Sequence, residues 1–335
     1  PFENEEKFNQ TLPVDFVSEG LDQTRGWFYS MLVMSVALFD KAPFKNVMVN
    51  GLVLAEDGRK MSKSLKNYPD LLPVAEEFGA DALRYYFLSS QVVRAEEFAY
   101  STKGLTEVNN KLINKLLNTV SLLEMYGVKN AEIKSHKEHI LDIWIHTLLQ
   151  KLVTTVTESL DAYQVDKAAR PILDFVEEFS TWYARRSRDR FKDADQASVV
   201  TGNMSYVLVT VAKLLAPMTP FVAEEIYQQL KAFGVHGLVE SVHLETWPVA
   251  EELSPIAEEV LDRMQKTRHI IEEGLALRNK EGLKVRQPLA SLTVAGEMYD
   301  ALYTDIITDE LNVKQVVKGE VQLALQLDTN ITEDL

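Results

Sequence analysis

The sequence contains no cysteine and fewer basic than acidic residues. Without cysteine, neither a disulfide bond nor a thiolate zinc site can form within its 335 residues. The uncharged run from Gly26 to Phe39 is shorter than the roughly 20 apolar residues that span a bilayer. Three glutamates precede the first lysine, unlike the basic start of a signal peptide. We therefore expect a cytoplasmic protein with no membrane partner.

The shortage of basic residues gives a net charge of −15. Such a balance argues against a uniformly basic surface that coats nucleic acid. The charge is uneven, however, because residues 296–335 hold two lysines and nine carboxylates, whereas residues 182–192 hold five basic residues and one aspartate. A local basic patch on an acidic protein is compatible with one specific polyanionic partner.

The residue pattern predicts a mixed fold, and its first part covers residues 1–100. Trp27 to Leu38 predicts a buried helix, and Val47 to Leu54 predicts a strand. A polar loop follows, and a helix is expected after Pro69. This order is typical of the edge of a Rossmann-type α/β sheet, where loops beyond the strand ends bind ligands.

Residues 101–250 and 251–335 form the second and third predicted parts. Apolar residues at helical spacing, such as Ile145, Leu149 and Val156, predict an all-α helical bundle for residues 101–250. After it, Pro255 to Lys280 predicts a long amphipathic helix. Two strand-like runs follow, and we expect a small α+β region there; the runs are Leu289–Val294 and Val321–Leu327.

The loop Gly58–Ser64 carries the clearest chemical signal. It places Lys60 and Lys63 beside two serines after a strand, but it lacks the glycine spacing of a P-loop. Mobile ammonium groups can stabilise the phosphate charge that develops in phosphoryl or nucleotidyl transfer. From composition alone, a solvated surface loop is the alternative.

Within this loop, the string Lys-Met-Ser-Lys-Ser resembles the second signature motif of class I aminoacyl-tRNA synthetases. The resemblance implies that Lys60 and Lys63 are catalytic, because they stabilise the ATP triphosphate while an amino acid is activated. It also implies that Gly51, Met61 and Ser62 contact ATP.

A second informative stretch runs from Ser18 to Phe28. Gly20 permits close backbone approach, Asp22 and Gln23 offer polar groups, and Trp27 offers a flat apolar wall. The alternative makes Asp22 a helix N-cap and Trp27 a core residue.

The same stretch resembles the segment that distinguishes isoleucyl-tRNA synthetases from the valyl, leucyl and methionyl enzymes. The resemblance implies that Trp27 lines the isoleucine pocket. The residues that it implies in adenylate binding are Glu19, Gly20, Asp22 and Gln23.

A third stretch, Thr181 to Phe191, is rich in arginine. On a continuous helix, Arg185 and Arg188 would share one face with Lys192, and Arg186 and Arg190 a neighbouring face. Arginine forks bind phosphates, and Trp182 offers a ring for stacking on a base. The alternative is a charged helix face that pairs with nearby carboxylates. The string resembles the anticodon-binding domain of isoleucyl enzymes, which implies tRNA binding by Trp182, Arg185, Arg186, Arg188 and Arg190.

The histidines predict no metal site. His136 and His139 are three residues apart, but no third ligand stands at a recognisable spacing, so we expect a surface pair.

Taken with the order of its motifs, the chain resembles a fragment of an isoleucyl-tRNA synthetase. The family's first signature, His-x-Gly-His, does not occur, so the N-terminal half of the catalytic domain and the editing domain are expected to be missing. The resemblance implies a parent enzyme that uses ATP with Mg²⁺ to form isoleucyl-adenylate and transfers isoleucine to tRNA(Ile). We expect the fragment alone to be inactive. The alternatives are a valyl-tRNA synthetase and a non-catalytic tRNA-binding protein.

Overall fold

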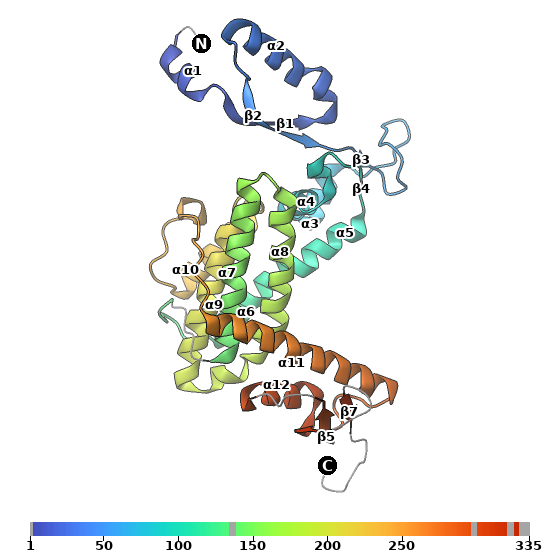
Figure 1. Cartoon of the computed structure of the whole chain (residues 1–335), viewed down its shortest axis with the longest axis vertical. Coiled ribbons are helices and arrows are strands. Elements are labelled where there is room, and N and C mark those ends of the chain that lie inside the picture. Colours follow the sequence, from blue (N-terminus) through green and yellow to red (C-terminus); the bar gives the residue numbers. More distant parts are fainter. Residues whose placement is uncertain (1–2, 134–138, 296–299, 320–324, 328–335) are drawn as a thin grey trace. The chain divides into compact units, whose positions relative to one another are not determined.

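The computed structural model describes residues 3–133, 139–295, 300–319 and 325–327. The chain folds into two compact units. The first unit contains residues 1–135 and 151–250, and the second contains residues 136–150 and 251–335 (Figure 1). Helix α7, Ile140–Asp161, contributes residues to both. This division into compact units does not test the expected domain boundaries at residues 100 and 250, which stay predictions.

The first unit begins with two parallel strands joined by a helix (Figure 1). After helix α1 the chain forms β1, a 3₁₀ turn, α2 and β2. Gly20, the last residue of β1, pairs with Asn50, the last residue of β2. The carboxyl ends of both strands therefore lie side by side. The elements are α1 (Glu5–Thr11), β1 (Val14–Gly20), η1 (Leu21–Arg25), α2 (Trp27–Phe39) and β2 (Phe44–Asn50).

Helix α2 forms where the sequence predicts it, but the expectation that it is buried is wrong. Only Phe28 and Ser35 are buried, and Leu38 is 72% exposed. The physical reason is that a sheet of two strands covers one narrow strip of the helix, on which Phe28 contacts Phe44 of β2. The apolar residues around the rest of α2 face outward.

The segment after β2 contains the polar loop and two short helices. Strand β3 (Val53–Leu54) pairs in parallel with β4 (Phe98–Ala99). The sequence predicts one helix after Pro69, whereas the structure has two, α3 (Leu71–Phe78) and α4 (Ala80–Leu88), which Gly79 separates. Gly79 has φ +84°, a conformation that interrupts a right-handed helix and favours glycine. A short turn, η2 (Gln91–Arg94), then leads to β4.

The remainder of the first unit is a helical bundle, as the sequence predicts (Figure 1). Its core helix α9 is buried along most of its length. Pro220 stands in the first turn of α10, where proline is well tolerated. The elements are α5 (Thr102–Val108), η3 (Asn109–Asn114), α6 (Lys115–Tyr126), the second half of α7, α8 (Val165–Glu178), η4 (Phe179–Ala184), η5 (Asp189–Lys192), α9 (Ala194–Leu215), α10 (Pro220–Phe233) and η6 (Val242–Leu244).

Among the described helices, α9 alone has the length and apolar composition of a membrane span. However, 78% of its most apolar window is buried within the structure. The central helix of a bundle has the same composition, so the match is weak evidence for a membrane.

Side chains of helix α4 bond to α8, to α10 and to the segment between α9 and α10. A carboxylate oxygen of Asp81, which is 3% exposed, accepts a 2.7 Å bond from a backbone amide in the first turn of α10. Arg84 donates to the carbonyl of Met218, just after α9, at 3.0 Å. The buried Tyr85 hydroxyl donates to the carbonyl of Ala169 in α8 at 2.6 Å. Burial raises the pKa of Tyr85, which keeps this hydroxyl protonated as a donor.

The segment after α10 is held to the bundle by Glu245. Its carboxylate accepts a hydrogen bond from the Tyr227 hydroxyl and lies 2.9 Å from the Lys213 ammonium. Burial acts to raise the pKa of Glu245, but the bonds from Tyr227 and Lys213 outweigh it and hold this pKa below its ordinary value. The folded state therefore favours the ionised carboxylate.

We expect Glu245→Gln to lower the free energy of unfolding by about 2 kcal/mol at pH 7, because a charge-assisted hydrogen-bond network is lost. A depressed pKa stabilises the fold above the unfolded pKa, and this contribution disappears as pH falls through the folded pKa. The difference between variant and parent should therefore shrink as the pH falls below the ordinary range of a glutamate pKa and then through the lowered folded pKa. Urea unfolding at pH 7 and at successively lower pH measures it. Glu240→Gln, at an exposed position, is the control and should change little; a difference that persists in acid would contradict the assignment.

The described part of the second unit contains the first half of α7 and a small three-stranded sheet with helices α11 and α12. Helix α11 (Pro255–Lys280) and strand β5 (Leu289–Val294) match the sequence prediction in extent. The sequence missed β6 (Val313–Lys318), which pairs in parallel with β5. Of the predicted strand Val321–Leu327, residues 321–324 lie outside the described part and Leu325–Leu327 form β7, antiparallel to β5. The remaining helix is α12 (Ala301–Leu311).

Candidate functional site

The predicted adenylate-binding residues gather at the carboxyl ends of β1 and β2. Glu19 and Gly20 close β1, and Gly51 follows the last residue of β2. The parallel pairing of Gly20 with Asn50 brings these positions to one sheet edge. Ligands of parallel α/β sheets bind beyond such carboxyl ends, so the architecture suits a small-molecule site here.

Gly51 lies against the backbone that leads into β4. Its amide donates to the Val92 carbonyl at 2.7 Å, and a Cβ at this position would lie 1.8 Å from the Glu96 carbonyl oxygen. No side chain fits there, so packing alone already requires glycine. This packing requirement does not test the predicted contact of Gly51 with ATP, which stays a prediction.

The polar residues Asp22 and Gln23 stand in η1, just before α2, and they do not act as the alternative interpretation predicts. Asp22 does not cap a helix; the side chain of Gln23 instead accepts a 2.9 Å bond from the Trp27 amide at the start of α2. Gln23 also donates to the Asp22 carboxylate at 3.0 Å. Trp27 is 44% exposed, so it does not occupy a core position in the described part of the chain.

The loop after β3 begins as a tight hairpin and is then clamped by an asparagine. The Ala55 amide donates to the Arg59 carbonyl at 2.8 Å, which turns the chain back. Further on, the Asn67 side chain accepts from the Ser62 amide at 2.9 Å and donates to the Lys60 carbonyl at 3.1 Å. Sequence reasoning missed Asn67, because nothing in its local pattern predicts which backbone groups it binds.

The two lysines of this loop are available to an anion. Lys60 and Lys63 are exposed, and no hydrogen bond or ion pair joins the side-chain ammonium group of either to a described residue. The neighbouring charges neutralise each other, because Arg59 and Asp57 form a 2.6 Å salt bridge that lowers the pKa of the Asp57 carboxyl. Two ammonium groups on a loop of defined path can approach a polyphosphate.

Met61 and Ser62, the other predicted ATP contacts in the loop, are partly buried. The Ser62 hydroxyl shares a 2.7 Å hydrogen bond with Ser64. Both residues therefore support the course of the loop, and their contact with a nucleotide stays a prediction.

The arginine-rich segment is not one continuous helix, so the predicted helical faces are wrong. The helix ends at Arg186, a turn follows, and η5 covers residues 189–192. The helix ends early because the side chain of Asp193 caps α9, accepting the amides of Asp195 and Gln196, so the chain must change direction before that point.

The side chains of this segment nevertheless divide into exposed and partly buried sets. Arg185 lies over the Trp182 ring, 5.9 Å from its centroid, and is exposed like Arg188. Arg186 is partly buried, and Arg190 donates to the Gln196 side chain at 3.1 Å. Arg185 and Arg188 are therefore the most accessible arginines of this segment.

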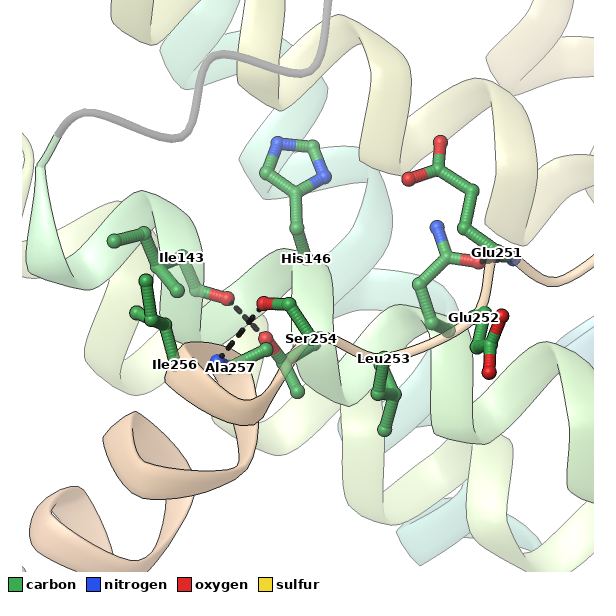
Figure 2. A pocket seen from close by; sticks show the side chains of 10 residues that line it. Ile143, His146, Glu251, Glu252, Leu253, Ser254, Ile256 and Ala257 are labelled. Atoms are coloured by element: carbon green, nitrogen blue, oxygen red, sulfur yellow. Dashed lines mark hydrogen bonds between the residues drawn. The ribbon is translucent and has the colours of Figure 1, made fainter.

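A pocket of about 220 Å³ lies in the second unit, between the first half of α7 and the start of α11. Its lining includes the buried His146 and the acidic residues Glu251 and Glu252 (Figure 2). The Ser254 hydroxyl, also in the lining, accepts the Ala257 amide and caps α11 (Figure 2). None of the predicted site residues lines this pocket.

The described residues contain no group of three or more histidines, cysteines, aspartates and glutamates that could hold a metal ion. His136 lies outside them, and the ring of His139 accepts the Leu141 amide at 3.2 Å. The expectation of a surface pair is therefore not tested.

Two protein-family models match the chain. Residues 1–99 match the class I tRNA synthetases of the I, L, M and V group. Residues 142–294 match the anticodon-binding domain of tRNA ligases. The matches fall on the strand region with its lysine loop and on the arginine-rich bundle.

Similar curated proteins include two isoleucine–tRNA ligases. The chain is 41% identical over 328 residues to that of Protochlamydia amoebophila, and 42% identical over 329 residues to that of Chlamydia trachomatis. Each alignment covers 94% of this chain and 31% of the relative. The chain thus spans about a third of the length of these relatives.

Among solved structures, the fold resembles a LeuRS of Agrobacterium radiobacter K84 determined with tRNA and LeuAMS. The TM-score is 0.55 at 22% identity, over 76% of this chain and 30% of that one. The likeness concerns the fold.

Proposed function

We propose, from the premise that this chain belongs to the class I tRNA synthetases, that it works as part of an isoleucine–tRNA ligase. The whole enzyme would activate isoleucine with ATP and transfer it to tRNA(Ile) in the cytoplasm. Residues 1–100 would complete the catalytic domain, residues 101–250 would bind the anticodon region, and residues 251–335 would form an α+β appendix.

The observation that carries the proposal is the lysine loop beside the sheet edge. Lys60 and Lys63 present two ammonium groups without carboxylate partners in the described part of the chain, on a loop that follows β2 and β3. During adenylate formation, negative charge on the departing pyrophosphate would be stabilised by these ammonium groups.

The edge residues would bind the rest of the adenylate. Glu19 and Asp22 carry exposed carboxylates that can accept hydrogen bonds from ribose hydroxyls or an amino group. Gln23 would act through its cap on α2, which fixes where Trp27 stands. The half-exposed Trp27 ring would form an apolar wall for the isoleucine side chain.

The resemblance to class I tRNA synthetases implies that ATP is used together with Mg²⁺. The described residues offer no group of three ligands for it, so the roles assigned here depend on the chain's own cations and polar groups. For tRNA, the exposed Arg185 and Arg188 would bind phosphates, and Trp182, Arg186 and Arg190 would shape that surface.

The proposal is tested by a chimera. The chain replaces the matching 328 residues of the Protochlamydia amoebophila ligase, and ATP–pyrophosphate exchange is measured with isoleucine, valine, leucine and methionine. We expect isoleucine to be preferred over valine by about 100-fold, as one methylene allows, and the isolated chain to be inactive. Preference for valine would favour a valyl-tRNA synthetase. A folded chimera that binds tRNA without any exchange would favour a non-catalytic tRNA-binding protein.

A further inference from the structure

The second unit carries a group of exposed cations on the turn that joins α11 to β5. Lys280, Lys284 and Arg286 are exposed, and residues 280–286 are called the basic loop here. None of the three cations forms an ion pair with a described residue, and Glu281 is the single acid in the loop. Such a group stands out in a chain with a net charge of −15.

Two other cations of the same unit, Arg263 and Lys266, are engaged in pairs. Arg263 lies 2.7 Å from Glu259 and also pairs with Asp300. Lys266 lies 2.6 Å from Asp262. These side chains belong to a balanced, solvated helix face, whereas the cations of the basic loop have their charge uncompensated.

A buried arginine holds the basic loop in shape. Arg278 is fully buried, and its guanidinium donates to the Lys284 carbonyl at 2.6 Å and to the Gln287 carbonyl. The Asn312 side chain donates to the Val285 carbonyl at 2.9 Å, which fixes the other side of the loop. The path of the loop is therefore defined by side chains.

Arg278 also adds to the local potential. Its Nε and Nη1 atoms are buried without a hydrogen-bond partner, and no described carboxylate pairs with it. An uncompensated charge under a surface raises the potential felt above it, since a low-dielectric interior screens poorly. The basic loop therefore presents its three exposed cations above a fourth positive charge.

We propose that the basic loop binds the phosphate backbone of tRNA, as a contact separate from the arginine-rich segment of the bundle. The inference rests on the proposed function and extends it to the second unit. RNA is favoured over a lipid surface because the loop lies within the match to the anticodon-binding domain, residues 142–294, and exposes a single large apolar side chain, Val285. Membrane-binding surfaces combine basic residues with a broad apolar face.

The test compares two double variants of the 335-residue chain by fluorescence titration with tRNA(Ile) and tRNA(Val) between 50 and 300 mM salt. Lys284→Gln with Arg286→Gln removes two charges of the basic loop. Lys266→Gln with Lys318→Gln removes two charges from the same unit, in mid-helix and at the strand end opposite the loop. Thermal unfolding of each variant verifies that it folds.

For the basic-loop variant we expect affinity to fall about 15- to 30-fold at 150 mM salt, and the slope of log K against log salt to become shallower by about 1.4–1.8. Both tRNAs should lose affinity equally, because phosphate contacts carry no sequence information. The control should keep its affinity within about twofold and its salt slope unchanged.

Equal affinities for the two double variants would overturn the inference while leaving the proposed function intact. If the unsubstituted chain binds neither tRNA, the tRNA-binding part of the proposed function fails together with it. Binding of phosphatidylserine vesicles that is lost in the basic-loop variant, with tRNA affinity unaffected, would assign the loop to lipid instead and overturn it.

Discussion

Replacing Lys60 or Lys63 with alanine should lower isoleucine-dependent ATP–pyrophosphate exchange by 100- to 1,000-fold in the chimeric ligase. Each ammonium would stabilise phosphate charge that grows in the transition state, and losing one such preorganised group costs about 3–4 kcal/mol of barrier. The loss should fall on kcat, with a small change in the KM for isoleucine. Steady-state exchange at varied isoleucine and ATP measures both.

Neither lysine substitution should change the stability of the protein. Both lysine side chains are exposed and contact no described partner, so their removal should alter the free energy of unfolding by less than about 0.5 kcal/mol. Lys66→Asn is the matched control, because it removes one charge from the same loop at a position with φ +47°, which asparagine tolerates. If Lys66→Asn is as damaging as Lys60→Ala, the general charge of the loop matters and the specific roles are wrong.

Gly51→Ala should produce the largest loss of stability among the predicted site residues. Its Cβ would lie 1.8 Å from the Glu96 carbonyl oxygen and 2.8 Å from the Glu96 amide nitrogen, and both are backbone atoms. The two segments must separate, and we expect a loss of about 3 kcal/mol. The thermal midpoint of the isolated chain should fall by roughly 6–12 °C.

Gly20→Ala provides the comparison for Gly51→Ala. Its Cβ would meet only the Asp22 side chain, with the nearest carboxylate oxygen at 2.7 Å, and that side chain can rotate away. We expect a change within about 1 kcal/mol. A Gly51→Ala protein as stable as Gly20→Ala would show that the backbone at Glu96 yields readily, and would contradict the packing argument.

Local sequence patterns predicted the extents of several elements well. The helices Trp27–Phe39 and Pro255–Lys280 and the strand Leu289–Val294 each form close to where the local residue pattern predicts them. The lysine loop was also predicted as a loop, because its glycine and polar residues exclude regular structure. These features depend on neighbours in the sequence.

The features that the sequence patterns did not predict depend on contacts with residues outside each local pattern. The burial of α2 depends on how wide a sheet it meets, which its own residues do not reveal. The arginine-rich helix ends because α9 needs Asp193 as its cap. Strand β6 is as long as β5 but carries two lysines and a glutamine, so its residues alone give no strand signal and its formation depends on the pairing with β5.

The candidate site likewise contains residues that the sequence predicted and residues that it did not. The motif strings point to Lys60, Lys63 and Trp27, and the structure leaves all three exposed to a ligand. The groups that fix their surroundings, Gln23 as cap and Asn67 as clamp, act on backbone atoms several residues away. Such contacts emerge only once the path of the chain is known.

The side-chain bonds of α4 affect how the first unit comes apart. Asp81, Arg84 and Tyr85 each join this helix to a different part of the bundle. The pair β1–β2 with its thinly covered helix has no comparable set of buried bonds among the described residues. We therefore expect the strand pair β1–β2 to open while α4 stays folded with the bundle. On this expectation the more stable part of the first unit begins near Gly79, inside the stretch that matches the synthetase domain, because local unfolding follows packing rather than family boundaries.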